Sequence, residues 1–222
     1  MRDLDARVAR TRLRPLASGR VGVRAAWLLI ALLCILGLLV LAQLPLVAQL
    51  TALASVALVA AYPFMKRITW WPQAWLGLVF SWGALVGWAS VTGGVDPAGW
   101  WLWGGSVFWV VGYDTLYAIQ DKEDDALVGV RSSARRLGHS APLGVAAFYL
   151  LALVGWGTAI WLVRPEPLAL LALAPAALHL LGQVLRADPD DGAKALALFR
   201  SNRFAGLLLA LGFAAVGLSS AA

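Results

Sequence analysis

The sequence predicts an all-α membrane protein, a polytopic helical bundle. Of its 222 residues, 61% are hydrophobic and only 14% are charged, whereas a soluble domain carries about 25% charged residues. The hydrocarbon core of a bilayer is about 30 Å thick, so a helix that crosses it needs about 20 apolar residues. Seven such runs occur, at residues 24–43, 46–63, 73–91, 100–118, 142–163, 166–185 and 204–221. We therefore expect seven transmembrane helices in a single membrane domain, residues 1–222.

Short connections rich in Gly and Pro alternate with longer polar ones along the chain. The short ones, at residues 43–45, 92–97 and 164–167, end helices where a span should end. Within the spans, small residues predict close contacts between helices, and the candidates are Gly83, Gly87, Gly104 and Gly105. One polar residue inside a span, His179, is expected to be a hydrogen-bonded core histidine.

The basic residues predict how the bundle is oriented. All of the 18 Lys and Arg residues except Arg164 fall in the N-terminal arm or near the longer connections, which lie on one side of the predicted bundle. Basic loops face the cytoplasm in most membrane proteins. We therefore expect a multi-pass protein of the cell inner (plasma) membrane with these loops in the cytoplasm. The lipid bilayer then explains the net charge of +6 without a nucleic-acid partner.

The most informative segment is residues 112–125, where carboxylates follow an apolar run. On a continuous helix, Asp114, Asp121 and Asp125 lie within about 40° of one face, with Tyr117 beside them. An ionised Asp in hydrocarbon costs about 2.5 to 3.5 kcal/mol, so several on one face require a compensating partner. Hard carboxylate oxygens suit Mg²⁺ that carries a phosphorylated substrate. The spacing predicts a site rather than a solvated helix end.

Two cationic segments accompany these acids on the basic side. Residues 2–14 contain five Arg residues, whose planar guanidinium groups suit diphosphate oxygens. Lys66 and Arg67 follow Tyr62 at the end of the second predicted span. Each segment alone also fits a membrane anchor, in which the basic side chains reach for the lipid headgroups. Acids, cations and an apolar cavity between helices together describe an enzyme for a lipid diphosphate.

These segments resemble the 4-hydroxybenzoate polyprenyltransferase branch of the UbiA superfamily of intramembrane aromatic prenyltransferases. The resemblance extends over essentially the whole chain and is carried by residues 3–19, 62–67, 112–125 and 199–202. It implies transfer of a polyprenyl group from polyprenyl diphosphate to 4-hydroxybenzoate, ortho to the hydroxyl, in ubiquinone biosynthesis. It also implies a fold of nine transmembrane helices.

The resemblance implies roles for particular residues. Mg²⁺ is expected to bind Asp5, Asp121 and Asp125, and Arg67 to bind the carboxylate of 4-hydroxybenzoate. Asp121, Asp125, Asp114 and Arg67 are then the expected catalytic residues. The other residues expected to surround the substrates are Lys66, Tyr62, Tyr117 and Arg2.

The family pattern starts earlier than this sequence. In the family, a motif Asn-Asp-x-x-Asp-x-x-x-Asp ends the second helix; Asp5 matches its last Asp, and Met1 stands where the preceding Asp is expected. This implies an N-terminally truncated chain that lacks the first two helices and is inactive or severely impaired. Two interpretations remain beside an active enzyme: an inactive fragment, or a non-catalytic seven-helix receptor-like or transport protein. A retinal-type photoreceptor would need a Lys in the last span, and residues 204–222 contain none.

Overall fold

The structure is a computed structural model that describes residues 12–127, 129 and 131–219. All regular secondary structure in these residues is helical, as expected. The chain forms two compact units, Met1–Pro45 and Leu46–Ala222. The first contains helix α2 (Val23–Leu41), a 19-residue segment of mean hydropathy 2.6. This value fits the first predicted span.

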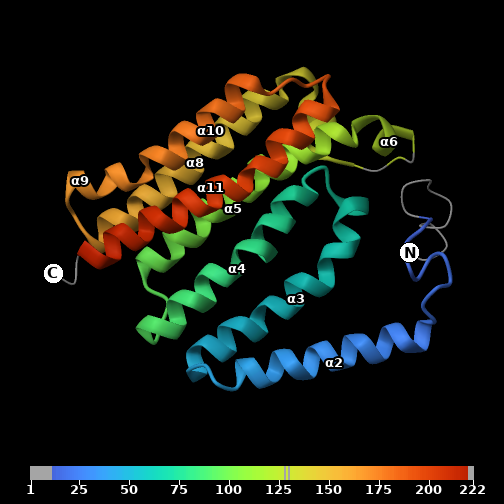
Figure 1. Cartoon of the computed structure of the whole chain (residues 1–222), viewed down its shortest axis with the longest axis horizontal. Coiled ribbons are helices and arrows are strands. Elements are labelled where there is room, and N and C mark those ends of the chain that lie inside the picture. Colours follow the sequence, from blue (N-terminus) through green and yellow to red (C-terminus); the bar gives the residue numbers. More distant parts are fainter. Residues whose placement is uncertain (1–11, 128, 130, 220–222) are drawn as a thin grey trace. The chain divides into compact units, whose positions relative to one another are not determined.

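The second unit is a bundle of long helices joined by short ones (Figure 1). Its long helices are α3 (Leu46–Ile68), α4 (Pro72–Thr92), α5 (Pro97–Gln120), α8 (Ala141–Val163), α10 (Ala174–Arg186) and α11 (Gly192–Ser219). Its short ones are α6 (Lys122–Leu127), α7 (Ser133–Leu137), η1 (Gly138–Ser140), α9 (Pro167–Leu170) and η2 (Leu171–Leu173).

Six segments of the described chain are long and apolar enough to cross a membrane. They are Val23–Leu41, Leu46–Met65, Pro72–Thr92, Ser133–Val163, Pro167–Arg186 and Gly192–Leu218, and they match six of the predicted spans. The remaining prediction, residues 100–118, lies within the 24-residue helix α5. This helix is roughly 36 Å long, but its Trp, Gly and Tyr residues and Asp114 lower its mean hydropathy. The helix is as expected, although composition alone does not mark it as a span.

Helix α5 is at the centre of the second unit, where it packs against α4, α8 and α11. The closest approach is to α8: a Cβ on Gly155 would lie 2.6 Å from the Cα of Gly105, and one on Gly105 would lie 2.9 Å from the Ala152 carbonyl oxygen. Leu116 of α5 and Val145 of α8 are fully buried in the same core. Glycine at these two positions allows the backbones to touch.

The other glycines predicted to make close contacts do not do so. A Cβ on Gly83, Gly87 or Gly104 would meet no described atom within 4 Å. That prediction was right for Gly105 and wrong for these three. The reason is that a small residue permits a close approach, but only the neighbouring helix decides which face is approached.

Two helices extend further than their apolar runs. Helix α11 starts at Gly192 and has 28 residues, about 42 Å against a hydrocarbon core of about 30 Å. Helix α3 continues to Ile68 and contains Pro63. Residues 62–67 and 199–202, singled out in the sequence, therefore lie on helices and not in loops.

Candidate functional site

A cavity of about 90 Å³ opens where the ends of several helices meet. It is lined from α3 by Tyr62, from α4 by Pro72 and Gln73, from α5 by Asp114, Tyr117 and Ala118, and from the segments that follow by Asp121, Asp125, Arg131 and Ser132. Three carboxylates and a guanidinium group therefore share one small space at the basic side of the bundle.

The carboxylates reach this cavity across a break in the helix. Helix α5 ends at Gln120, and Asp121 has φ −92° and ψ 2° before α6 begins at Lys122. The N–H of Asp125 donates to the carbonyl oxygen of Asp121 at 2.8 Å, so the chain makes a further helical turn after the break. The expected single helical face is thus interrupted at Asp121. The three acids nevertheless line the same cavity, with Asp121 only 7% exposed.

Arg131 is anchored beside the acids by contacts with the end of α3. Its Nη1 donates to the carbonyl oxygen of Ile68 at 3.0 Å. The guanidinium carbons of Arg131 and Arg135 each lie 5.6 Å from the ring centroid of Trp70. Arg135 also donates from Nη1 to the carbonyl oxygen of Asp125 at 3.3 Å. These contacts connect the acidic turn with α3 and the start of α7.

Buried hydrogen bonds hold the start of α7 against α4 and α5. The N–H of Ser133 donates to Oε1 of Gln73 at 3.0 Å. Thr115 Oγ1 donates to the Val111 carbonyl oxygen at 2.7 Å, and its single hydrogen is thereby used. The 2.8 Å contact between Thr115 Oγ1 and Ser133 Oγ is therefore donated by Ser133. Since Ser133 and Thr115 are fully buried, this arrangement fixes the adjacent Arg131 and Ser132 at the cavity.

The predicted site residues fall into two groups. Tyr62, Asp114, Tyr117, Asp121 and Asp125 come together at the cavity. Of the others, Lys66 and Arg67 belong to helix α3, but their side chains are outside the described part of the structure. Arg2 and Asp5 lie outside the described residues altogether. Sequence reasoning did not select Gln73, Arg131 and Ser132 for the site.

The donor set at the cavity can be compared with what a metal ion needs. In the described part of the chain, no group of three or more His, Cys, Asp or Glu side chains is arranged to hold a metal. Asp121 and Asp125 nevertheless offer carboxylate oxygens to one space. Mg²⁺ is usually held by one or two carboxylates together with substrate phosphates and water. The residues present fit an ion that arrives with a diphosphate, not a closed protein cage.

A second polar cluster joins α8, α10, α11 and α5 inside the bundle. Gln183 is its centre and is fully buried. Its Oε1 accepts from Tyr149 Oη at 2.6 Å and from Asn202 Nδ2 at 3.3 Å. Asn202 Oδ1 in turn accepts from Trp109 Nε1 at 2.9 Å. His179 Nε2 accepts from Gln183 Nε2 at 3.2 Å, which confirms the predicted hydrogen bond, although the His179 side chain is only half-buried and lies at the edge of the core.

The cluster is connected to the cavity through aromatic rings. Phe199, one helical turn before Asn202 on α11, lies with its ring centroid 4.9 Å from that of Tyr117. Tyr117 lines the cavity. The segment 199–202 thus supports one wall of the site from behind.

The chain is similar to known membrane prenyltransferases in both sequence and structure. The model of the UbiA prenyltransferase family matches residues 2–208. The chain is 40% identical over 212 residues to a protein of Drosophila melanogaster named 4-hydroxybenzoate polyprenyltransferase, mitochondrial. This match covers 95% of the chain and 54% of the fly protein. A Caenorhabditis elegans protein of the same name is 38% identical, with 96% of the chain and 60% of the relative covered. The chain therefore spans little more than half the length of these curated relatives.

A solved structure agrees with the fold. The apo structure of a UbiA homolog from Aeropyrum pernix K1 superposes with a TM-score of 0.72 at 25% sequence identity, covering 96% of this chain and 80% of that one. Fold, family match and sequence identity extend over nearly the whole chain. The chain belongs to the UbiA prenyltransferase family.

Proposed function

We propose that this multi-pass membrane protein transfers a polyprenyl group from polyprenyl diphosphate to the ring of 4-hydroxybenzoate, ortho to the hydroxyl, in ubiquinone biosynthesis. The observation that carries the proposal is the cavity that joins Asp114, Asp121 and Asp125, in a chain about 40% identical to proteins of that name. Membership of a prenyltransferase family argues against the receptor-like or transport interpretation.

The proposal includes Mg²⁺ as the cofactor, held by Asp121 and Asp125 as a complex with the diphosphate. By resemblance, Asp5 is the third ligand. When bound, the ion supplies positive charge that stabilises the departing diphosphate. The support for this part is the chemistry of the two carboxylates, because hard oxygen ligands prefer hard cations.

Other residues of the chain bind and orient the substrates. Arg131 places a guanidinium group at the cavity, where it donates to the diphosphate oxygens and stabilises their charge. In the reaction, the bond between the prenyl carbon and the diphosphate oxygen breaks with its electrons on the diphosphate. A bond then forms to the ring carbon, which releases its hydrogen as a proton.

Further side chains complete the site in this proposal. Tyr62 and Tyr117, which also line the cavity, cover the reacting groups and limit the access of water. Arg67 binds the substrate carboxylate, with Lys66 and Arg2 near it. These last three roles rest on the resemblance.

In the proposed orientation the protein lies in the inner (plasma) membrane and its cavity faces the cytoplasm. Its support is the distribution of basic residues, since only Arg164 lies near a connection of the opposite side. The curated relatives carry the word mitochondrial in their names. What is proposed for this chain is that its basic side faces the cytoplasm.

The function is tested with membranes from cells that carry the native gene and from cells in which it is deleted. Radiolabelled 4-hydroxybenzoate, Mg²⁺ and a polyprenyl diphosphate are added, and products are separated by chromatography and identified by mass. We expect a ring-prenylated product only with the native gene. Equal product in the deletion strain, or product only from another aromatic acceptor, would contradict the proposal.

A further inference from the structure

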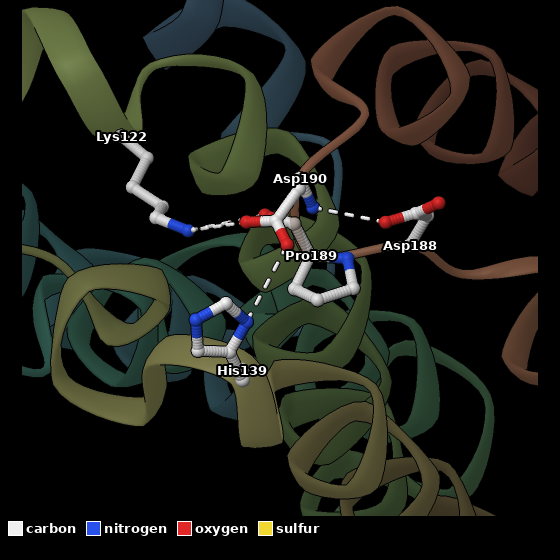
Figure 2. Close-up of polar contacts among 5 residues, drawn as sticks. All are labelled: Lys122, His139, Asp188, Pro189 and Asp190. Carbon is white, nitrogen blue, oxygen red and sulfur yellow. Dashed lines mark hydrogen bonds and ion pairs between the residues drawn. The ribbon is translucent and has the colours of Figure 1, made fainter.

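The loop between α10 and α11, residues 187–191, lies against the junction of α5 and α6. Lys122 Nζ donates to the carbonyl oxygen of Pro189 at 3.2 Å and to Oδ1 of Asp190 at 3.2 Å. Figure 2 shows this lysine reaching from its helix to the loop. Lys122 follows Asp121 directly, yet Asp121 lines the cavity and the Lys122 ammonium group binds the loop. Two consecutive side chains thus connect the loop with the site.

The loop is itself well ordered by local bonds. Asp188 Oδ1 accepts from the N–H of Asp190 at 3.0 Å, as Figure 2 also shows. Asp191 Oδ1 accepts from the N–H of Lys194 at 2.9 Å, as an N-terminal cap of a helix does. A Cβ on Gly192 would lie only 3.2 Å from the Cα of Gln120, so the first residue of α11 contacts the last residue of α5. The loop is a firm support for the junction.

Asp190 also connects a third segment. Its Oδ2 lies 3.4 Å from Nδ1 of His139 in η1, while its Oδ1 binds Lys122 (Figure 2). One carboxylate thereby joins the start of α6, the η1 turn and its own loop. The α10–α11 loop is distant in the sequence from the start of α6 and from η1, and Asp190 connects it to both.

We propose that Lys122 and Asp190 are positioning residues, which hold the α5–α6 junction so that Asp121 and Asp125 face the diphosphate-bound cation. The inference rests on the proposed function. The backbone of Asp121 departs from α-helical geometry, with φ −92° and ψ 2°. The orientation of the Asp121 side chain therefore depends on what holds the next residue, Lys122. Ligands must be held to within about 0.5 Å for effective binding.

The proposal distinguishes positioning from stability. The side chains of Lys122 and Asp190 are 30% and 61% exposed, and ion pairs this accessible contribute little to the free energy of unfolding. Their loss should therefore act on the geometry of the neighbouring acids. Residues that orient metal ligands typically change metal affinity or activity by about 10- to 100-fold when replaced.

The kinetic test compares Lys122→Met and Asp190→Asn with wild type, using variants introduced at the native gene. We expect the apparent KM for polyprenyl diphosphate and the half-saturating Mg²⁺ concentration to rise about 10-fold. The KM for 4-hydroxybenzoate should be unchanged, and Lys122→Arg should restore most of the loss because it keeps the charge. Lys194→Met is the control, since it removes one positive charge from the exposed first turn of α11.

A binding measurement makes the inference independent of turnover. Mn²⁺ with inorganic pyrophosphate is titrated into the purified protein and followed by electron paramagnetic resonance. We expect the Kd for Mn²⁺ to rise about 10-fold in Lys122→Met and to stay at the wild-type value in Lys194→Met, with equal thermal unfolding midpoints.

The outcomes separate the inference from the proposed function. Equal Kd values in Lys122→Met and wild type overturn the inference, as does a lowered unfolding midpoint that accounts for the loss. If wild type binds Mn²⁺ but does not prenylate 4-hydroxybenzoate, the proposed function fails, and the Kd values alone decide on the positioning role. If wild type binds no Mn²⁺ with pyrophosphate, the metal site fails, and the inference fails with it.

Discussion

Arg131 contributes a guanidinium group to a cavity whose other charged lining residues are Asp114, Asp121 and Asp125. Its contacts with the Ile68 carbonyl oxygen and the Trp70 ring leave the planar group in one orientation. Such a fixed group suits a diphosphate better than a flexible ammonium, because its donors are already arranged for two oxygens. In the proposed function, the carboxylates bind the cation and Arg131 binds the anion that accompanies it.

We predict that Arg131→Met lowers kcat/KM for the polyprenyl diphosphate by about 100-fold, the loss typical of one donor to a developing negative charge. Steady-state kinetics in membranes at matched protein levels measure this. Arg136→Met is the control, because Arg136 is an exposed residue of α7 that does not line the cavity. Similar rates for both variants would show that Arg131 has only a structural role.

The two acids nearest the helix break give a second prediction. Asp121→Asn or Asp125→Asn should reduce prenyl transfer below detection with little change in thermal unfolding, because each removes a proposed metal ligand and keeps the side-chain shape. Glu123→Gln is the matched control: it neutralises an exposed acid on α6. Near-normal turnover of either Asn variant at saturating Mg²⁺ would mean that these carboxylates are only water-exposed side chains at a helix end and bind no catalytic metal.

At the scale of residues, helical spacing predicted which helix residues line the cavity, but it could not predict which loop residues do. Tyr62, Asp114 and Asp121 could be predicted as neighbours from helical periodicity and family resemblance, and they do line one cavity. Arg131 was counted only as a basic loop residue. Its place at the cavity depends on Ile68 and on Trp70, more than 60 positions away, and no local pattern encodes such a contact.

At the scale of elements, the α5–α8 contact holds the wall that carries Asp114. We predict that Gly105→Ala lowers the free energy of unfolding by about 1–3 kcal/mol, as overpacking of a close-packed core does. The added Cβ would lie 2.8 Å from Trp156 Cδ1 and 2.9 Å from the Ala152 carbonyl oxygen. Thermal unfolding of the purified protein in detergent measures the change.

Gly104→Ala is the control for this prediction. A Cβ there would meet no described atom within 4 Å, and Ala favours a helix over Gly by about 1 kcal/mol. Its unfolding midpoint should equal or exceed that of wild type. If Gly105→Ala is as stable as Gly104→Ala, the backbones of α5 and α8 are not in close contact.

The elements also show where sequence patterns stop being informative. Apolar runs predicted each long helix, because burial in lipid requires them. The break at Asp121 was not predicted, since residues 112–125 fit one continuous helix by periodicity. In the structure the helix breaks where Gly192 contacts Gln120 and where Lys122 binds the α10–α11 loop. A helix end set by another loop leaves no signature in its own residues.

At the scale of the whole molecule, charge separates the two ends of the bundle. The acids and Arg131 gather at the end of α5, where Lys122 also binds the α10–α11 loop. At the other end of α8, Arg164 Nη2 pairs with Glu166 Oε2 at 2.9 Å. The basic residue that departs from the general pattern is thus compensated by a neighbouring acid, which leaves the asymmetry in charge intact.

This asymmetry gives the last prediction, on orientation. Positive loops are retained on the cytoplasmic side during insertion, so the connection that contains Gly129 should face the cytoplasm and the turn at Gly93 and Gly94 should face the opposite side. The chain truncated after Gly129 should fluoresce when it is fused to green fluorescent protein. The same truncation fused to alkaline phosphatase should be inactive, because the phosphatase needs an oxidising compartment for its disulfides. Fusions after Gly94 should give the reverse. Phosphatase activity after Gly129 would contradict this orientation and place the cavity outside the cytoplasm, so that the proposed acceptor, 4-hydroxybenzoate, would have to reach it from the other side of the membrane.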